Sequence, residues 1–332
     1  MNSRERFLQT LSRGFPDRIP CFEEGIRDET LEAWQSQGLP SGLKLSKRFH
    51  FDPREELEPE MRPLPSFSRW PSTYKELDEL RRRLDPQDPA RLPEGWDENL
   101  SAWKSRQNVL MMRVHRGFFL SLGVDGWNRF SEVIAMTMDN PGLVQEILNI
   151  QGKFAAQLAE RILKEIEVDA VIFGEPIGGS HGPLISPKMY ERIMIPSLKP
   201  IFEVLERYEV KNIILRTYAN TRVLIPCLVN AGINCLWACE TEPKAMDYTN
   251  IRKELGSDLN LIAGVDLDLL REDRQTIYNE FKNRVIPLIN KWGYIPLADG
   301  RVREDIPFRN YAYYRELLEK VTGHKGDLVY TK

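Results

Sequence analysis

The sequence PGLVQEILNIQGKFAAQLAERILKEIEVDAVIFGE, residues 141–175, joins a helix pattern to a strand pattern. Between Pro141 and Glu167, apolar residues recur at helical spacing: Leu143, Ile147, Ile150, Phe154, Leu158 and Ile162. Asp169 to Glu175 is then a short, continuous apolar run that ends in a carboxylate. Continuous rather than alternating hydrophobicity is typical of a strand that helices cover on both faces. This stretch therefore predicts one helix-and-strand unit of an α/β fold.

The same alternation of buried strand and helix continues along most of the chain. The other apolar runs are Arg18–Phe22, Val109–His115, Asn212–Tyr218, Ile233–Glu240, Asn260–Asp266 and Gly293–Asp299, and Leu45–Asp52 is the candidate for the eighth strand. Repeated units of this kind, with right-handed crossovers and this spacing, favour a (β/α)8 TIM barrel over an open sheet. The chain has 332 residues, of which 42% are hydrophobic, enough for one barrel domain spanning residues 1–332.

Helix ends and one irregular segment complete this prediction. Ser3 is expected to cap the first helix, which Gly14 ends, and Ser186 to cap a helix that begins at Pro187. Residues 52–100 are charged, weakly periodic and interrupted by eight prolines. We interpret them as a Pro-rich N-terminal insertion that covers one end of the barrel, or as an ordinary surface excursion.

Composition excludes several classes of partner. The net charge is −3, and basic residues are interspersed with acidic ones, so neither nucleic acid nor an anionic membrane is an expected partner. The charged N-terminus lacks the apolar core of a secretory signal, and no apolar run approaches the roughly 20 residues of a membrane span. We therefore expect a cytoplasmic protein whose four cysteines are reduced and mostly buried.

The cysteine spacing does not predict a zinc site. Cys235 and Cys239 lie four residues apart on a predicted strand, which separates them by about 13 Å. Two thiolates this far apart cannot bind one zinc ion together. The sequence also lacks a dinucleotide-binding glycine pattern, a P-loop and a serine nucleophile elbow in the required strand-to-helix context.

Polar side chains at the ends of the predicted strands are the candidate site residues, because barrel enzymes place their reactive groups there. They are Glu23, Glu24, Arg27, His115, Arg116, Glu175, His181, Arg216, Tyr218, Asn220, Glu240, Asp266, Asp299 and Arg301. Glu175 is the main catalytic candidate, since it ends a buried strand and precedes a glycine-rich loop. His181, in that loop, is a candidate general acid or metal ligand.

Each of these assignments has a structural alternative. Asp266 and Asp299 can simply cap the loops that follow them. Arg216 can be an ion-pair partner of Glu240 or Glu175, and His181 can be a surface loop residue.

The chain resembles the uroporphyrinogen decarboxylase superfamily, which also contains the corrinoid-dependent methyltransferases, over nearly its whole length. The resemblance is carried by Ser3-Arg4-Glu5-Arg6-Phe7 with Pro16-Asp17-Arg18-Ile19-Pro20, Gly182-Pro183-Leu184-Ile185-Ser186-Pro187, Ala231-Gly232-Ile233-Asn234, Met246-Asp247, Ala263-Gly264-Val265-Asp266, Trp292-Gly293-Tyr294-Ile295-Pro296 and Asp305-Ile306-Pro307-Phe308-Arg309-Asn310-Tyr311. It implies a TIM barrel with a polar pocket at the carboxyl ends of its strands.

Departures from the family patterns narrow the reaction. The decarboxylases hold substrate carboxylates with an arginine pair near the first strand, where this chain has Glu23 and only Arg27 matches. Their late Gly-His-Gly turn is absent at Asp299-Gly300-Arg301. The thiol-methylating members bind zinc through a His-x-Cys and a later Cys, but the matching positions here are Arg216-Thr217-Tyr218 and the vicinity of Asp299. Both reactions are therefore disfavoured.

The remaining branch implies transfer of a methyl group from a small methoxylated or methylated substrate, such as a methoxyaromatic compound, to cobalamin or another corrinoid on a partner protein. His181, Tyr218 or Glu175 would then protonate the leaving group, and Arg216 would stabilise a phenolate. A metal bound by Glu175, His181, Glu240 or Asp266 is an alternative Lewis acid.

Other readings stay open. One is a decarboxylase of a porphyrinogen or other carboxylic acid that Arg27, Arg216 and Arg301 bind. Another is a non-catalytic tetrapyrrole-binding protein. Aromatic residues of the last predicted helix form either a homodimer surface or part of the core: Phe308, Tyr311, Tyr313 and Tyr314.

Overall fold

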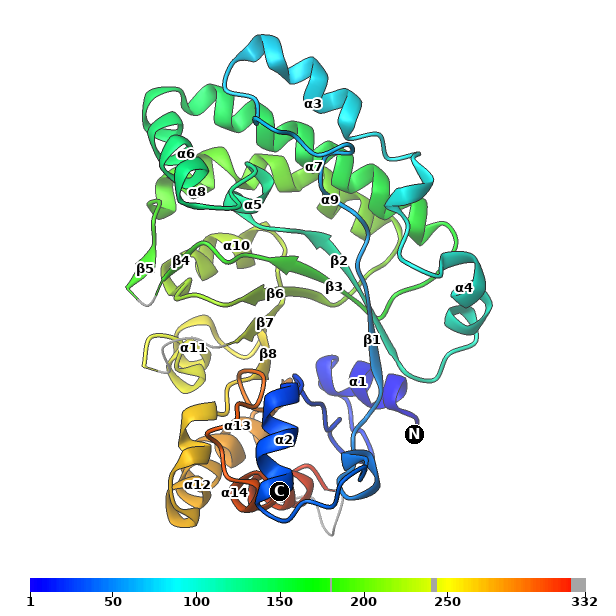
Figure 1. Ribbon diagram of the computed structural model, residues 1–332, viewed down its shortest axis with the longest axis vertical. Coiled ribbons are helices and arrows are strands. Elements are labelled where there is room, and N and C mark those ends of the chain that lie inside the picture. Colours follow the sequence, from blue (N-terminus) through cyan, green and yellow to red (C-terminus); the bar gives the residue numbers. More distant parts are fainter. Residues whose placement is uncertain (180, 240–243, 324–332) are drawn as a thin grey trace. The chain divides into compact units, whose positions relative to one another are not determined.

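The computed structural model describes residues 1–332 except 180, 240–243 and 324–332. It has a mixed α/β fold of the TIM-barrel type, in which parallel strands alternate with helices, as the sequence predicts (Figure 1). The chain forms two compact units, here called the N/C unit (Met1–Arg54, Gln107–Val109 and Cys235–Lys332) and the central unit (Glu55–Arg106 and Leu110–Asn234).

Three buried parallel strands form the core of the central unit. They are β2 (Val109–His115), β3 (Ala170–Gly174) and β6 (Ile213–Thr217). The predicted bounds of β2 are confirmed, and the other two strands are one residue shorter at each end than predicted. Continuous apolar runs therefore locate these strands well, because both of their faces are buried.

Two long helices cover one face of these strands. The helices α7 (Pro141–Leu163) and α9 (Ile195–Arg207) lie side by side (Figure 1), and Phe173 of β3 stacks on Phe202 of α9 with ring centroids 5.0 Å apart. Gly152 permits the close approach of the helices, since a Cβ atom there would lie 1.8 Å from the Ser197 carbonyl oxygen. The other elements are α5 (Phe118–Ser121), α6 (Trp127–Asp139), β4 (Gly178–Gly179), β5 (Gly182–Pro183), α8 (Pro187–Ile193), η4 (Arg222–Leu224) and α10 (Ile225–Ala231).

The Pro-rich segment, residues 52–100, contains several regular helices and a strand, although its sequence is only weakly periodic. It contains β1 (Arg54–Leu57), η2 (Tyr74–Glu76), α3 (Leu77–Arg83), η3 (Pro89–Arg91) and α4 (Trp96–Lys104). The guanidinium of Arg91 is fully buried and donates hydrogen bonds to four backbone carbonyls of this segment, those of Glu60, Arg62, Arg83 and Asp85. It also lies over the ring of Phe154 in α7, 4.9 Å from the centroid. The segment is thus anchored on α7, and its covering of a barrel end stays a prediction.

The N/C unit contains the remaining parallel strands, β7 (Cys235–Ala238), β8 (Asn260–Ala263) and β9 (Tyr294–Ile295). The last run, predicted as Gly293–Asp299, is a two-residue strand followed by an isolated bridge between Val265 and Ala298. The helical elements are α1 (Ser3–Leu11), α2 (Asp28–Ser36), η1 (Leu45–Lys47), α11 (Tyr248–Leu255), η5 (Leu267–Arg271), α12 (Arg274–Glu280), the π-helical turn η6 (Phe281–Val285), α13 (Ile286–Ile289) and α14 (Phe308–Val321).

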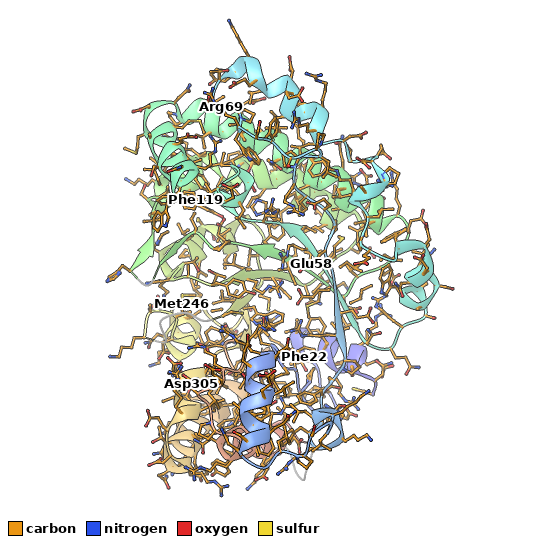
Figure 2. The ribbon with its side chains drawn as sticks, viewed as in Figure 1. Phe22, Glu58, Arg69, Phe119, Met246 and Asp305 are labelled. Atoms are coloured by element: carbon orange, nitrogen blue, oxygen red, sulfur yellow. The ribbon has the colours of Figure 1, made fainter. Side chains whose placement is uncertain are left out.

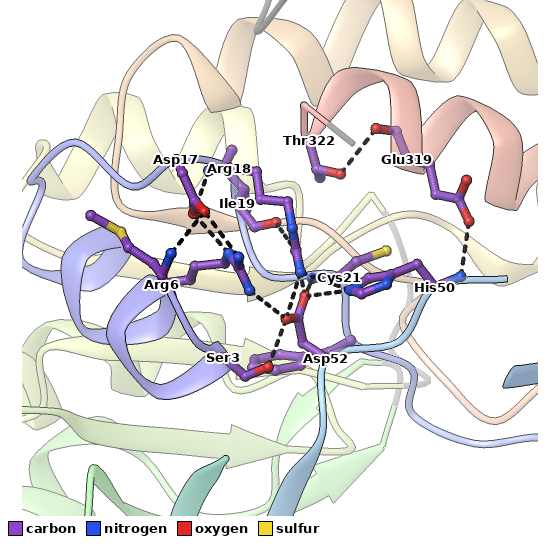
Figure 3. A network of polar contacts seen from close by, with 12 residues as sticks. Ser3, Arg6, Asp17, Arg18, Ile19, Cys21, His50, Asp52, Glu319 and Thr322 are labelled. Atoms are coloured by element: carbon purple, nitrogen blue, oxygen red, sulfur yellow. Dashed lines mark hydrogen bonds and ion pairs between the residues drawn. The ribbon is translucent and has the colours of Figure 1, made fainter. Parts of the chain in front are cut away.

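Two predicted strands are wrong. Residues 18–22 form no strand, and 45–52 contain the short helix η1 instead. The physical reason is the buried carboxylate of Asp52, which accepts hydrogen bonds from Ser3 Oγ (2.7 Å), the Cys21 N–H (2.8 Å) and the Arg18 guanidinium (2.6 and 2.9 Å) (Figure 3). Burial opposes the ionisation of Asp52, but these hydrogen bonds outweigh it and lower the pKa to about 2. A side chain thus links segments that the prediction assigned to strands.

The helix caps are partly as predicted. Asn2, rather than Ser3, caps α1, because its side chain accepts from the Glu5 N–H (2.8 Å) and Glu5 accepts from the Asn2 N–H (3.0 Å). Ser186 caps α8 as predicted, accepting from the Met189 N–H at 3.3 Å. Among the helices of the described residues, none has an apolar stretch of the length that a membrane span requires.

Three of the four aromatic residues of α14 belong to the core. Tyr311 and Tyr314 are fully buried and Phe308 is nearly so, whereas Tyr313 is partly exposed. The Tyr314 hydroxyl accepts from the Ala298 N–H at 2.8 Å. The alternative that these three residues form an exposed homodimer surface is therefore wrong.

Candidate active site

The faces of β3 determine which side chains can reach a common site. Phe173 faces α9, so Ile172 and Gly174 face the opposite side, because side chains alternate along a strand. Arg113 of β2 pairs with Ile172, and Arg216 of β6 pairs with Gly174. Directly paired residues share a face, so both arginines lie on the face away from α9. In a TIM barrel this is the face that points into the barrel.

Arg216 is held by a carboxylate that the sequence did not single out. Its two terminal nitrogens donate to the two carboxylate oxygens of Glu56 in β1, each at 2.7 Å. This parallel, two-bond geometry fixes the plane of the guanidinium. The predicted ion pair exists, but Glu175 is not its partner, and Glu240 lies outside the described residues.

A second arginine on this face, Arg113 of β2, also pairs with a glutamate from the region of β1. Arg113 contacts Glu58, just beyond β1, with 2.9 Å between Nη2 and Oε1 (Glu58 is labelled in Figure 2). Glu56 and Glu58 were missed because they lie in the Pro-rich segment. Their alternation with the buried Leu57 is a strand-like pattern that could have revealed them.

Glu175 lies at the carboxyl end of β3 and is almost completely buried. Oε1 accepts from the Phe118 N–H at 3.0 Å, and Oε2 accepts from the Tyr190 hydroxyl at 2.6 Å. Gly117 leaves room for this carboxylate, since a Cβ atom there would lie 2.9 Å from Oε1. Burial raises the pKa of Glu175 to about 7, and the hydrogen bonds from Tyr190 and Phe118 oppose this rise. Glu175 can therefore change its protonation state near neutral pH, and it holds the turn between β2 and α5.

His115 lies on the α9 side of the strands. The register between β2 and β3 shifts after Arg113, so that His115 pairs with Phe173 and stacks on its ring, with centroids 6.0 Å apart. The ring nitrogen Nδ1 accepts from the Gly117 N–H at 2.9 Å. Burial lowers the pKa of His115 to about 4. The imidazole is therefore neutral at pH 7, and the structure does not bring it to the face that carries Arg216.

Three predicted residues lie in the loops after β3 and β6. His181 is exposed in the loop between β4 and β5, and Tyr218, directly after β6, is 48% exposed. The Asn220 N–H donates to the Gly179 carbonyl at 3.2 Å, so the two loops are in contact. Apolar Leu184 and Val223 are also more than half exposed in these loops. The loops thus combine accessible polar groups with an exposed apolar surface.

In the N/C unit, Glu23 is fixed by the last helix. Its Oε2 accepts from the Tyr311 hydroxyl at 2.9 Å and from the buried guanidinium of Arg315 at 3.3 Å. Arg54 contacts the carboxylate of Glu24 at 3.4 Å and lies over the ring of Trp237, 4.9 Å from the centroid. Phe22, labelled in Figure 2, also lies under Arg54.

Other predicted residues of this unit act at helix ends. Arg27 is exposed at the start of α2. Asp266 accepts from the Asp268 N–H (2.9 Å) and so caps η5, which confirms the capping alternative for this residue. Asp299 accepts from the Leu267 N–H (3.1 Å) at the start of the same helix, rather than from the loop that follows Asp299. Burial, with the negative charges of Asp266 and Asp268, raises the pKa of Asp299 to about 7.

The described residues include most of the potential metal ligands and all four thiols. Within the described residues, which omit Glu240, no three His, Cys, Asp or Glu side chains are placed to bind one metal ion. All four cysteines lie in the described part of the chain, and none forms a disulfide bond, as predicted.

A TIM-barrel-type chain with charged side chains at its strand ends has the architecture typical of barrel enzymes. Residues 124–295, more than half of the chain, match the family model of uroporphyrinogen decarboxylase (URO-D), and the chain therefore belongs to this family. Its structure is similar to that of a methyltransferase from Methanosarcina mazei, with a TM-score of 0.63 and 13% identity, covering 96% of this chain and 99% of that one. At this identity the likeness shows the fold. No curated protein matches the sequence.

Proposed function

We propose that this URO-D family member is a methyltransferase that moves a methyl group from a small methoxylated or methylated compound to a corrinoid carried by a partner protein. Its family membership supports this proposal, and its fold is shared with a methyltransferase. Family members of the decarboxylase type act on a polycarboxylate, so the charge of the pocket distinguishes the two reactions.

Glu23 is the observation that carries the proposal. Where the decarboxylase pattern has a carboxylate-binding arginine, this chain has a carboxylate that Tyr311 and Arg315 hold in place. Its neighbour Glu24 is an additional carboxylate, which Arg54 contacts. Because both carboxylates are paired with arginines, this position offers no free guanidinium to a substrate with several carboxylates, which disfavours the binding of such a substrate.

Removal of a methyl group from an ether or amine leaves a poor leaving group that needs a proton or charge stabilisation. Tyr218 is accessible directly after β6 and can supply the proton, and His181 is the second accessible donor. Arg216, oriented by Glu56, can stabilise a developing phenolate. The corrinoid, when bound, supplies the nucleophile that accepts the methyl group. The exposed apolar side chains Leu184 and Val223 in the loops after β3 and β6 fit a broad, largely apolar ring.

Glu175 supports this chemistry from the other side of β3. Because its oxygens bind the Phe118 N–H and the Tyr190 hydroxyl, we assign it a positioning role for the turn after β2. Its replacement by Gln should lower methyl transfer and shift the pH profile, since Gln cannot ionise. A merely structural role would lower activity equally at every pH.

The first test is a methyl-transfer assay with reduced cobalamin and a panel of methoxylated aromatics and methylamines, read as the conversion of cob(I)alamin absorbance to that of methylcobalamin. Tyr218→Phe should lower kcat by about 10²-fold or more, the usual contribution of a general acid. Tyr278→Phe, in α12, is the matched control because Tyr278 is 43% exposed, and it should leave kcat unchanged. Equal rates for both variants would remove Tyr218 from the mechanism.

Arg216→Ala tests the charge-stabilising role. We expect a loss of about 10²-fold in kcat with phenolic leaving groups, as for the loss of an oxyanion-stabilising donor. Arg207→Ala, at the exposed end of α9, is its control. Release of carbon dioxide without any corrinoid, together with no methyl transfer across the panel, would contradict the proposal and favour a decarboxylase.

A further inference from the structure

A charged cavity of about 440 Å³ lies within the central unit, between the segment that follows β1 and the carboxyl end of β2. Its charged lining residues are Glu58, Glu60, Arg62, Glu94, Arg113 and Arg116. Of the lining residues, the sequence analysis named Arg116 as a strand-end residue, but neither it nor the family match assigns a ligand to this cavity. Its volume is within the range of about 300 to 1,000 Å³ that is typical of small-molecule pockets.

Two of the three arginines in this cavity already have carboxylate partners. Arg113 contacts Glu58 at 2.9 Å. Arg62 binds both carboxylate oxygens of Glu60, at 2.5 to 3.1 Å, and its backbone N–H donates to the same group. The acceptor atoms of Glu60 are therefore directed at Arg62.

Arg116 differs from them. In the part of the chain that the structure describes, no carboxylate lies within ion-pair distance of its guanidinium, and no hydrogen-bond acceptor contacts it. The side chain is only partly exposed. Burial and the positive charges of Arg62 and Arg113 lower the pKa of Arg116, whereas Glu60 raises it. A guanidinium that is partly removed from water without a partner is costly, unless a ligand supplies the missing charge.

The shape of β2 brings Arg116 to the same cavity as Arg113. In a regular strand, residues three apart face opposite sides. Val114 is an extra residue in β2 that has no partner in β3, because Arg113 pairs with Ile172 and His115 with Phe173. As a result, the side chains of residues 113 and 116 lie on the same side of the strand. Both arginines accordingly line the cavity.

We propose that this cavity binds the carboxylate of a small organic acid, with the guanidinium of Arg116 as its two-bond partner. A guanidinium and a carboxylate match in geometry as well as in charge. A carboxylate carries one negative charge for the one arginine that lacks a partner, and Glu58, Glu60 and Glu94 repel it less than they would a phosphate dianion. This inference rests on the proposed function in one respect: the acid is the compound that carries the methyl group.

Calorimetric titration of the full chain without any corrinoid tests the inference, with 4-methoxybenzoate, methoxybenzene and inorganic phosphate as probes. We expect 4-methoxybenzoate to bind most tightly. Arg116→Gln should weaken its binding by about 10- to 100-fold, the equivalent of a charge-assisted hydrogen bond. Arg116→Lys should restore part of the affinity, because it keeps the charge and loses the fork. Arg69→Gln, in an exposed part of the same Pro-rich segment (Figure 2), should leave it unchanged.

Other outcomes overturn the inference. Equal binding of methoxybenzene or phosphate, no binding of 4-methoxybenzoate, or equal binding by Arg116→Gln and wild type would each do so, provided that the thermal unfolding of the variant is unchanged. The proposed function fails separately. Binding of 4-methoxybenzoate without methyl transfer from any substrate contradicts the methyltransferase but not the pocket, whereas transfer from methoxybenzene that Arg116→Gln leaves intact contradicts the pocket alone.

Discussion

At the scale of the residue, Glu175 makes stability depend on pH. Its folded-state pKa of about 7 lies above the ordinary value of 4.5, so the folded chain holds a proton there that the unfolded chain has released. The stability that Glu175 contributes is therefore fully present below pH 4.5 and is lost as the pH rises to about 7. The loss is on the order of 3 kcal/mol.

Glu175→Gln should remove this dependence, because a neutral amide resembles the protonated carboxyl. Between pH 4.5 and 7.5, the free energy of unfolding of wild type should fall relative to that of the variant, because only wild type loses the contribution of Glu175. Denaturant unfolding of both proteins at several pH values measures this difference. Other groups that titrate, such as Asp299, are present in both proteins, so their effects cancel in the difference. Parallel pH curves for the two proteins would mean that Glu175 stays ionised when folded.

The sequence identifies residues that end buried strands, but not their partners. Glu175 and Arg216 were found because each follows an apolar run. Glu56 is 160 positions from Arg216, and no local pattern indicates such a pairing. His115 was a candidate because it ends the run Val109–His115, but the register shift in β2 turns its side chain toward Phe173.

At the scale of the element, the contact between α7 and α9 depends on Gly152. A methyl group there would lie 1.8 Å from the Ser197 backbone oxygen, so the helices must separate. Gly152→Ala should destabilise the fold by about 1 to 3 kcal/mol, even though alanine favours helices. Gly126→Ala is the control, since Gly126 precedes α6 with extended backbone and open space around it. Unchanged thermal unfolding of Gly152→Ala would show that the two helices adapt without cost.

Strands that are buried on both faces were predictable, and the others were not. The runs that became β2, β3, β6, β7 and β8 are mostly apolar and almost entirely buried. By contrast, β1 consists of Arg54, Glu55, Glu56 and Leu57, in a segment rich in proline, so its only strand-like signal is the short alternation of Glu56, Leu57 and Glu58. The two wrong strands, at residues 18–22 and 45–52, contain several polar residues, and the carboxylate of Asp52 joins them by accepting from the Arg18 guanidinium and the Cys21 N–H.

At the scale of the whole molecule, neither compact unit is a continuous piece of chain. The chain passes from one to the other at residues 54–55, 106–107, 109–110 and 234–235. We expect residues 1–332 to unfold as one domain, because neither unit can lose its structure without disturbing segments that enter the other. Scanning calorimetry should show one transition, with equal calorimetric and van't Hoff enthalpies. Two separable transitions would contradict the single-domain prediction.

The extra residue in β2 also has a consequence for the comparison of sequences. A relative without a counterpart of Val114 would present the same side chains to the same sides of its strand, although its chain would be one residue shorter there. Sequence alignments rarely place a gap inside a buried strand, so such a relative would be aligned to this chain without a gap at Val114. Arg116 would then be matched to the neighbour of its true equivalent, and a shared arginine would look like a variable position. Structural superposition, rather than sequence alignment, would be needed to identify the equivalent of Arg116 in such a relative.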